Sequence, residues 1–459
     1  MAQMILSRLS ASVVAVLCSV TLLVAEELAA DVNRLVGVSQ IDITPDYPVR
    51  LTGYGSRREE ASKVEQRLRA KAIAFGSDAE GPAVLVTVDN LGVPASMRTE
   101  VLRRVATRSK LQSERFTISS SHTHCAPMLL GLAPNIFSMD IPAEHLPAIE
   151  RYTRELTDKL EQVILAALAN RKPARLHWGI GKVGFAANRR SFPIKPVDHD
   201  LPVLRITNPN GDVRGILTGY ACHCTTLSSN FFHADWAGSA QLALEREFPG
   251  AIALTAIGCG ADQNPAPRST LELVTQHGES LAKEAKRLVN EKLTPVNGAL
   301  VCRTKNIELA YAKLPTREEW QAIADGKSGG VYHAKKNLAR LDRGEKLPTK
   351  LPYLVQTWSF GNELAMVFLP GEVVVDYSLR LKHEFDRTRL WVNGYSNDVP
   401  CYIPSKRVLD EGGYEGGGAM IYFDRPTKFA GDVEDRIIKA VHELIPKGFL
   451  AKLPQNPQP

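Results

Sequence analysis

Residues 116–124 read Phe-Thr-Ile-Ser-Ser-Ser-His-Thr-His, an apolar segment that runs directly into polar residues. The segment Phe116–Ser120 is typical of a β-strand, and similar segments recur along the chain. Several are almost wholly apolar, which is the pattern of strands buried on both faces. The other predicted strands are Leu35–Ile43, Arg69–Phe75, Ala83–Val88, Val203–Ile206, Ile216–Cys222, Ala251–Ile257, Leu364–Leu369 and Leu390–Val392.

Helical patterns lie between these strands. The clearest spans Leu146 to Leu168, where apolar residues recur every three or four positions. Another is expected to begin with Ser96 as its N-cap. Strands that alternate with helices predict an α/β fold in which a large, twisted, mixed β-sheet is covered by helices. An eightfold βα barrel is not favoured, because no regular alternation is seen.

The chain shows no internal repeat and no long linker, so we expect one large domain over residues 31–447. Residues 316–350 are the most polar stretch and carry helical charge patterning, which indicates a helical excursion on that domain. Residues 448–459 end in a Pro- and Gln-rich sequence and are expected to form a disordered tail.

Composition excludes several classes of protein. The 459 residues are 44% hydrophobic and 23% charged, values typical of a soluble globular protein rather than a disordered or multi-span membrane protein. The net charge of +6 comes from 56 basic and 50 acidic residues that are spread along the chain, so no nucleic-acid partner is expected. This charge permits only peripheral contact with anionic membrane lipid.

Residues 1–30 have the pattern of a secretory signal peptide. Arg8 provides a positive start, Ala11 to Ala25 form a short apolar run, and Ala25 or Ala30 offers a small residue for cleavage. An uncleaved membrane anchor is the alternative. We therefore expect an exported protein, either periplasmic or secreted.

Six cysteines follow this segment, and four of them lie beside polar motifs. An even number in an exported protein permits disulfides, but six in more than 400 residues do not make a disulfide scaffold. Small buried thiols near a site are the favoured interpretation. A metal-binding pair formed by Cys222 and Cys224 is the alternative.

His122 and His124 follow the strand Phe116–Ser120. Side chains two residues apart on a strand point to the same face, so both imidazoles can enter one cleft. Neutral imidazole is a common zinc ligand, and the spacing favours a metal site over two polar residues that simply close a strand. His223 also follows an apolar strand, and His233 lies ten residues further on. Because ligand sites of α/β folds gather at strand ends, the histidines are expected to converge there.

Two further segments carry chemistry. Pro370-Gly371-Glu372 places a carboxylate at a strand end, where it can be a zinc ligand, a general base or merely a charge at a helix N-terminus. The Gly-rich segment 412–418 surrounds Tyr414 and either approaches a ligand closely or is a surface loop. Residues 258–265 do not match a nucleotide-binding fingerprint, and the chain has no P-loop and no G-x-S-x-G elbow.

In their order along the chain, these motifs resemble the N-terminal catalytic domain of the neutral ceramidase family. The similarity begins at Gly37–Pro45 and Leu51–Tyr54. It continues through Ser121–His124, Cys222-His223, Pro370–Glu372 and Asn393–Tyr395 to Tyr414–Gly416. No single motif is decisive, but the ordered set is specific and covers residues 31–447.

The resemblance implies one zinc ion per chain, held by two histidines, one glutamate and one tyrosine. Carried over by motif, these ligands are His122, His223, Glu372 and Tyr402. The family has a Tyr-Ile pair 12 residues before the tyrosine of Tyr-Glu-Gly, and Tyr402-Ile403 and Tyr414-Glu415-Gly416 reproduce that spacing. Tyr414 and His124 are then contacts to the substrate carbonyl or its oxyanion, and Arg189 corresponds to an arginine that lines the family's site.

One departure from the family concerns a proposed catalytic serine. The corresponding region here, Gly258–Pro265, contains no serine, and Gln263 lies near its place. An amide can hydrogen bond to substrate but cannot act as a nucleophile. The leading hypothesis is a zinc-dependent hydrolase that cleaves the amide of N-acylsphingosine, or of a related N-acyl compound, with zinc-activated water. The alternative is a non-catalytic exported protein that keeps the fold and metal and binds lipid or another ligand.

Overall fold

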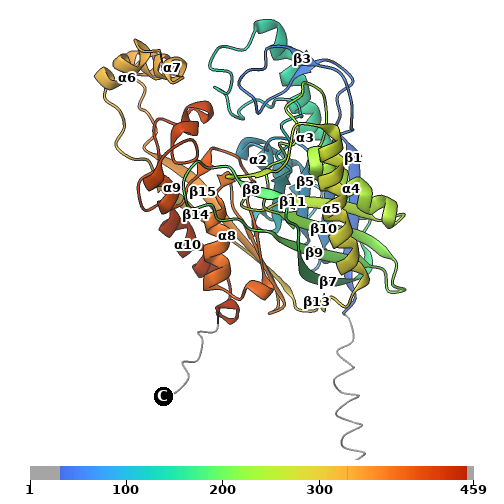
Figure 1. Ribbon diagram of the computed structural model, residues 1–459. Coiled ribbons are helices and arrows are strands. Elements are labelled where there is room, and N and C mark those ends of the chain that lie inside the picture. The colour runs from blue at the N-terminus through green and yellow to red at the C-terminus, as the bar shows by residue number, and fades with distance from the viewer. Residues whose placement is uncertain (1–31, 328, 452–459) are drawn as a thin grey trace, which may run out of the picture.

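The computed structural model describes residues 32–327 and 329–451. Two β-sheets pack face to face, and helices cover the outer face of each, so the molecule is built in four layers (Figure 1). The predicted α/β class and the large mixed sheet are confirmed. The second sheet is a feature that the sequence analysis did not separate.

The larger sheet has nine strands in the order β11-β10-β9-β7-β1-β4-β5-β6, with β13 paired to β7. Most neighbours are antiparallel, whereas β10 with β11 and β5 with β6 are parallel. The predicted strands of this sheet are found at their expected places. Its members are β1 (Arg34–Asp42), β4 (Arg69–Phe75), β5 (Ala83–Val88), β6 (Phe116–Ser120), β7 (Lys172–Lys182), β9 (Asp200–Thr207), β10 (Val213–Tyr220), β11 (Ile252–Ile257) and β13 (Thr294–Pro295).

The smaller sheet has four strands in the order β14-β15-β16-β18. These are β14 (Leu300–Ala310), β15 (Lys350–Phe360), β16 (Leu364–Phe368) and β18 (Leu390–Asn393). Apolar side chains from both sheets form one cluster between them, with Ile73 and Leu85 from the larger sheet and Trp358, Met366 and Trp391 from the smaller. Burial of this layer is what holds the two sheets together.

Helices pack on both outer faces. On the larger sheet these are α2 (Ala95–Ala106), α3 (Leu146–Ala169), α4 (Asp235–Glu247) and α5 (Leu271–Asn290); on the smaller they are α8 (Val375–Glu384) and α10 (Val433–Leu444). The predicted apolar stripe of α3 is buried, with Leu156, Leu160 and Ile164 inaccessible to solvent. The helix α2 begins at Ala95, one residue before the predicted cap Ser96, and no side chain caps it.

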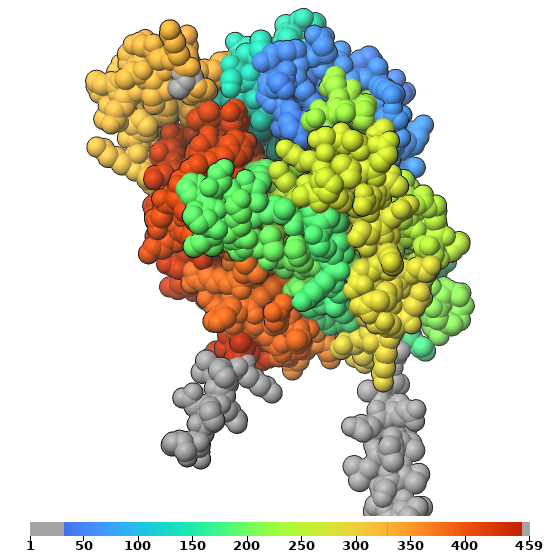
Figure 2. Space-filling model, in the orientation of Figure 1, coloured from blue at the N-terminus to red at the C-terminus, as the bar shows by residue number. Residues whose placement is uncertain are grey.

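The expected excursion at 316–350 contains two short helices, α6 (Arg317–Ala324) and α7 (Val331–Asp342). Thr316 caps α6 in a capping box with Glu319. The two helices enclose a small apolar cluster of their own and project from one end of the molecule (Figure 1 and Figure 2). Ion pairs between Arg340 and Asp424 fasten α7 to the main body.

The larger sheet curls, so that its edge strands β6 and β11 contact each other. Short ladders close the region where the strands end. They are β2 (Val49–Arg50) with β3 (Glu60–Ala61), β8 (Ala186–Asn188) with β12 (Gln263–Pro265), and β17 (Glu372–Val373) with β19 (Tyr402–Ile403). The helix α9 (Lys406–Glu411) follows β19. This curling brings the segments after β6 and after β10 to the same place.

Short 3₁₀ helices complete the described chain: η1 (Ser113–Arg115), η2 (Ala143–His145), η3 (Arg387–Arg389), η4 (Gly418–Phe423) and η5 (Lys447–Phe449). Phe449 in η5 is fully buried, so the packed domain reaches beyond the expected boundary at residue 447. The predicted signal peptide and residues 452–459 of the expected tail lie outside the described residues. Within the described part, no helix is long and apolar enough to span a membrane.

The six cysteines of the described chain are free thiols. Five are buried and Cys302 is partly buried, in line with the favoured interpretation. Burial raises the pKa values of the Cys222 and Cys224 thiols, and among the described residues neither belongs to a cluster of three or more potential metal ligands.

Candidate metal centre

His122 lies in the segment that leaves β6, where the backbone adopts a left-handed conformation with φ of 57°. Non-glycine residues rarely adopt this conformation, and such strain gathers at functional sites. The ring is fixed because its Nδ1 lies 2.5 Å from the carbonyl oxygen of Leu91. A carbonyl only accepts hydrogen bonds, so Nδ1 carries the hydrogen and Nε2 of the neutral ring presents a lone pair.

His223 enters from the end of β10 and is oriented in the same way. Its Nδ1 lies 2.7 Å from the carbonyl oxygen of Gly260, so Nε2 again presents a lone pair. The indole of Trp236 donates to the His223 carbonyl at 2.8 Å and holds the backbone in place. Burial, with a smaller contribution from the charge of Arg189, lowers the pKa of His223 to about 4, so the imidazole is neutral at pH 7.

Glu372 begins β17, and its carboxylate lies between the two imidazoles. The oxygen Oε2 is 3.2 Å from Nε2 of His122 and 3.1 Å from Nε2 of His223. The residue is only 3% exposed. Burial alone would raise the pKa of Glu372, and only positive charge at the Nε2 atoms of His122 and His223 lowers it, so an ionised carboxylate at this point requires a cation beside it.

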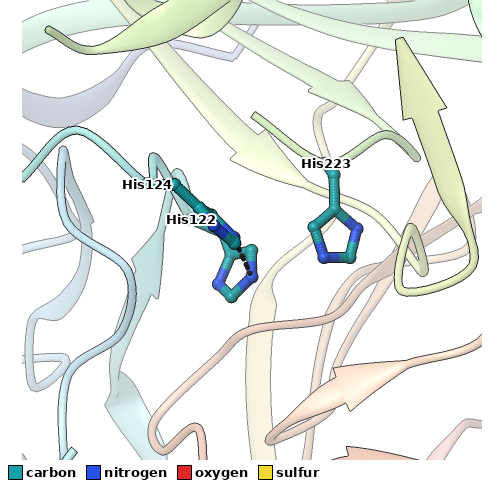
Figure 3. Close-up of side chains that lie close together, drawn as sticks. All are labelled: His122, His124 and His223. Atoms are coloured by element: carbon teal, nitrogen blue, oxygen red, sulfur yellow. Dashed lines mark hydrogen bonds between the residues drawn. The ribbon is translucent and has the colours of Figure 1, made fainter. Parts of the chain in front are cut away.

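Two imidazole lone pairs and a carboxylate oxygen therefore meet at one buried point. His124 joins them, since its Nε2 is 3.3 Å from Nε2 of His122, and donor atoms of the three histidines all lie within 4.8 Å of one another. Figure 3 shows His122 and His124 together on one segment, with His223 approaching from another. Converging acceptors of this kind repel one another unless a cation lies among them, and nitrogen and carboxylate donors suit zinc. The residues fit a zinc ion.

Tyr402 begins β19 and is paired in register with Glu372 of β17. Residues paired across neighbouring strands project from the same face, so Tyr402 shares the face from which Glu372 reaches the histidines. Its phenol oxygen accepts a hydrogen bond from Arg189 at 3.0 Å. The structure thus brings all four predicted ligands to one region, with His122, His223 and Glu372 in direct contact.

A cleft of about 700 Å³ opens beside this centre. Of the three histidines, only His124 lines it, together with Tyr54, Phe192 and Tyr414. The volume is typical of small-molecule sites. The ring of Tyr414 is 5.2 Å from that of Tyr402, and 43% of the residue is exposed. Burial of its hydroxyl end and the charge of Glu372 raise the pKa of Tyr414, so the phenol keeps its proton.

Arg189 follows β8 and also lines the cleft. Besides Tyr402, its guanidinium contacts Glu415 at 2.9 Å and Asn264 at 3.3 Å. It lies over the rings of Tyr402 and Tyr414, 5.8 and 5.7 Å from their centroids. Arg189 therefore lies at the site, where the sequence analysis expected it.

Gln263 is placed differently from the expectation that it contacts substrate. It is fully buried, its Nε2 donates to the Ala221 carbonyl at 2.5 Å, and its Oε1 accepts from the Asp198 amide at 3.0 Å. Its own carbonyl accepts from the His223 amide at 2.9 Å. Both ends of the side-chain amide are used by the main chain, so Gln263 supports the loop that carries His223.

Two residues singled out as parts of motifs have unexpected roles in the structure. His233 accepts a hydrogen bond from the Asp235 amide and is not among the clustered histidines. Glu415 proves to be the common partner of Arg189 and Arg190, each of which contacts a different oxygen of its carboxylate. The Tyr-Glu-Gly motif includes this glutamate, but nothing in the motif indicates that its partners are two arginines far away in the sequence.

Comparisons with known proteins agree with these motifs. Residues 34–256 match the family described as neutral/alkaline non-lysosomal ceramidase, N-terminal. A neutral ceramidase of Drosophila melanogaster is 24% identical over 46% of this chain, and one of Pseudomonas aeruginosa is 22% identical over 85% of it. The matched region spans 32% of the Drosophila protein and 70% of the Pseudomonas protein.

Solved structures share the fold. A ceramidase complexed with C2 superposes with a TM-score of 0.71 at 18% identity, covering 93% of this chain and 78% of that one. The neutral ceramidase of Pseudomonas aeruginosa gives 0.69 at 19% identity and covers 93% and 77%. Residues 34–256 therefore match the neutral ceramidase family, and the fold is that of the solved ceramidase structures.

Proposed function

We propose that this protein is a zinc-dependent amidohydrolase that cleaves the amide bond of N-acylsphingosine or of a related N-acyl compound. The observation that carries the proposal is the meeting of His122, His223 and Glu372 at one buried point beside an open cleft. The match of residues 34–256 to the neutral ceramidase family supports the choice of a lipid amide as substrate.

One zinc ion per chain would be held by His122, His223, Glu372 and Tyr402. When bound, it supplies Lewis acidity, which polarises a carbonyl and lowers the pKa of water. A metal site whose ligands are all protein atoms is typical of a structural role, whereas catalytic sites keep a position open. We assign His124 to the substrate side because it lines the cleft. With four protein ligands, a reacting group would take a fifth position, an expansion that catalytic zinc sites can undergo.

The residues around the cleft have separate tasks. Tyr414 keeps its proton, so its hydroxyl can donate to the carbonyl oxygen as that oxygen becomes negative. Burial, with the neighbouring His122 and His223, lowers the pKa of His124 well below its ordinary value, so it serves as a neutral hydrogen-bonding group. Arg189 orients Tyr402 and adds positive charge beside the developing oxyanion.

The overall reaction consumes one water. Its oxygen adds to the amide carbon, the C–N bond breaks, the acyl part leaves as a carboxylate, and the amine leaves as an ammonium ion with both protons of the water. Gly258–Pro265 offers no serine to form an acyl-enzyme, and the Gln263 amide is occupied. We therefore propose direct attack by water; an acyl group trapped on a Ser, Thr or Cys side chain would contradict this step.

A second candidate is a non-catalytic exported protein that binds lipid through the same cleft. The absence of the serine at Gly258–Pro265 favours it. The two candidates differ in one observable: a zinc-loaded binding protein hydrolyses no N-acyl or ester substrate.

Export is also proposed, on the signal-peptide pattern of residues 1–30. An exported enzyme with a lipid substrate must take it from a membrane or a micelle, and the mild positive charge favours peripheral contact with anionic lipid.

The proposal is tested by replacing the central carboxylate. Glu372→Gln keeps the shape of the side chain but removes the charge among the imidazoles, so we expect loss of bound zinc and a fall of at least about 10³-fold in hydrolysis of N-acylsphingosine. Glu308→Gln is the matched control, because Glu308 is exposed and pairs only with Lys350. Full activity in Glu372→Gln would contradict the proposal.

A further inference from the structure

Arg189 contacts the proposed ligand Tyr402, but an arginine side chain is long and flexible. Its hydrogen bond to the phenol oxygen needs a guanidinium held in one orientation. The two other contacts of this guanidinium are with Glu415 and Asn264, at 2.9 and 3.3 Å. The bond with Glu415 is the shorter and joins two charges, so it is the stronger constraint.

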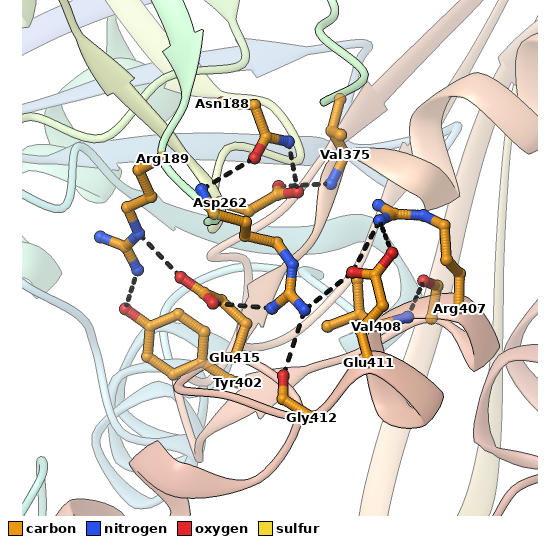
Figure 4. A network of polar contacts seen from close by, with 12 residues as sticks. Asn188, Arg189, Asp262, Val375, Tyr402, Arg407, Val408, Glu411, Gly412 and Glu415 are labelled. Carbon is orange, nitrogen blue, oxygen red and sulfur yellow. Dashed lines mark hydrogen bonds and ion pairs between the residues drawn. The ribbon is translucent and has the colours of Figure 1, made fainter. Parts of the chain in front are cut away.

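Glu415 is shared by two neighbouring arginines. Its Oε1 accepts from Nε of Arg189, and its Oε2 accepts from Arg190 at 2.8 Å (Figure 4). Arg190 in turn contacts Glu411 at 2.9 Å and the carbonyl of Gly412 at 3.1 Å. The side chain of Arg190 is inaccessible to solvent and that of Glu415 is 6% exposed.

The charges of this group balance. Arg189 and Arg190 face Glu415 and Glu411, and Arg407 links Glu411 to Asp376. A buried ion pair that loses one member leaves an uncompensated charge, and that charge seeks a new partner or water. Without Glu415, the Arg189 guanidinium would lose its shorter, charged contact and be free to leave the Tyr402 phenol.

We propose that Glu415 is a positioning residue, which holds the Arg189 guanidinium against the phenol oxygen of Tyr402 and so sets that oxygen for metal binding. Glu415 acts through Arg189: it lies at the wall of the cleft, but its two carboxylate oxygens are taken by Arg189 and Arg190. The inference rests on the zinc site of the proposed function and adds to it a carboxylate outside the ligand set.

The test measures zinc affinity of the full chain by competition with a chromophoric chelator, which requires no hydrolysis. Glu415→Gln keeps the size of the side chain but cannot compensate both arginines. We expect zinc affinity to fall about tenfold or more, the range seen when residues that orient metal ligands are replaced. Glu411→Gln is the matched control: it removes a charge from the same group but leaves Arg189 and Glu415 bonded, and it should bind zinc as the parent does.

A double-mutant cycle distinguishes positioning from a general loss of stability. In a Tyr402→Phe background the phenol oxygen is gone, so Glu415→Gln should cause no further loss of zinc affinity. The inference would be overturned if the losses of zinc affinity multiply in the double variant, or if Glu415→Gln alone leaves zinc affinity unchanged. If Glu415→Gln does not fold, Glu415→Asp keeps the charge but shortens the reach, and it should show the same loss and the same cycle.

The outcomes also separate this inference from the proposed function. A parent protein that binds zinc and hydrolyses no N-acyl substrate would refute the function, while the affinity cycle would still decide the role of Glu415. A parent protein that binds no zinc would overturn both.

Discussion

At the scale of single residues, the account depends on which side chains touch the metal and which touch the substrate. Tyr414 and Tyr402 are neighbouring phenols with different surroundings. Both line the cleft, but Tyr402 is 4% exposed and accepts from Arg189, whereas Tyr414 is 43% exposed. We therefore assign the buried Tyr402 as a metal ligand and the more exposed Tyr414 as a substrate contact.

Tyr414→Phe is expected to lower turnover by about 10²-fold and to leave the zinc content unchanged, because it removes one donor to the developing oxyanion. Turnover and bound zinc are measured on the same preparation. Tyr422→Phe is the control, since its ring lies 6.1 Å from that of Tyr414 but does not line the cleft. Equal loss of zinc and turnover in Tyr414→Phe would mean that Tyr414 is a ligand.

Gln263→Ala is expected to act on stability. It leaves the Ala221 carbonyl and the Asp198 amide without partners in the core, which costs about 1–3 kcal/mol for each buried group. Urea unfolding measures the effect, with Gln321→Ala on the exposed face of α6 as control. A large fall in turnover per folded molecule, with the free energy of unfolding unchanged, would show instead that Gln263 contacts the substrate.

His122, His223 and Glu372 could be singled out from the sequence because each follows an apolar strand, whereas Tyr402, Tyr414 and Arg189 were expected only from the resemblance to the family. The roles of Gln263 and Glu415 could not be predicted. Both depend on partners far away in the chain, such as the 226 positions that separate Arg189 from Glu415. Nothing local to Gln263 indicates that its amide is used by the main chain.

At the scale of elements, the strand ends place the ligands. The predicted strands were found, but the sequence did not indicate that the larger sheet curls until β6 meets β11. That contact brings His122 and His223 together although they belong to opposite ends of the strand order. The curling arises from strand twist summed over the whole sheet, so no local sequence pattern predicts it. The separate smaller sheet was missed for a similar reason.

The α6–α7 pair is the element most easily detached. It has its own small apolar cluster, and Arg340 fastens α7 to Asp424 on the main body. Arg340→Ala is expected to lower protection from hydrogen exchange over residues 317–342 by about tenfold, since a charged hydrogen-bonded pair is worth about 1.5–3 kcal/mol before solvent screening.

The control for this prediction lies on the same pair of helices. Arg317→Ala removes an arginine whose pair with Asp342 is exposed, with the two side chains 54% and 56% accessible. Such pairs contribute about 0–1 kcal/mol, so exchange should change little. Equal effects of the two variants would show that the Arg340 pair does not fasten α7.

At the scale of the whole molecule, buried histidines set the response to acid. Burial lowers the pKa of His233 to about 4, and burial likewise lowers that of His333 to about 4 despite the nearby Asp424. Above the ordinary value of about 6.5 both rings are neutral, folded or unfolded. As pH falls below about 6.5, the unfolded chain takes up protons that the folded chain does not, so stability is lost until about pH 4.

At pH 5 we expect the free energy of unfolding to be smaller than at pH 7.5 by about 2 kcal/mol for each of these histidines. Urea unfolding with chelator present removes metal binding from the measurement, and comparison of His333→Gln with the parent separates His333 from the other buried histidines. The variant His333→Gln should lose less stability between the two pH values than the parent. An unchanged pH dependence would show that His333 is not a buried neutral group.

The central claim is that zinc held at the meeting point of His122, His223, Glu372 and Tyr402 makes this chain a hydrolase of N-acyl lipids. The most direct test is the hydrolysis of N-acylsphingosine by purified protein of known metal content, before chelation, after it, and after zinc is restored. The account predicts one zinc per chain, activity that disappears with the metal, and activity that returns with zinc. Hydrolysis that continues in metal-free protein, or a fully zinc-loaded protein that hydrolyses no N-acyl or ester substrate, would contradict it.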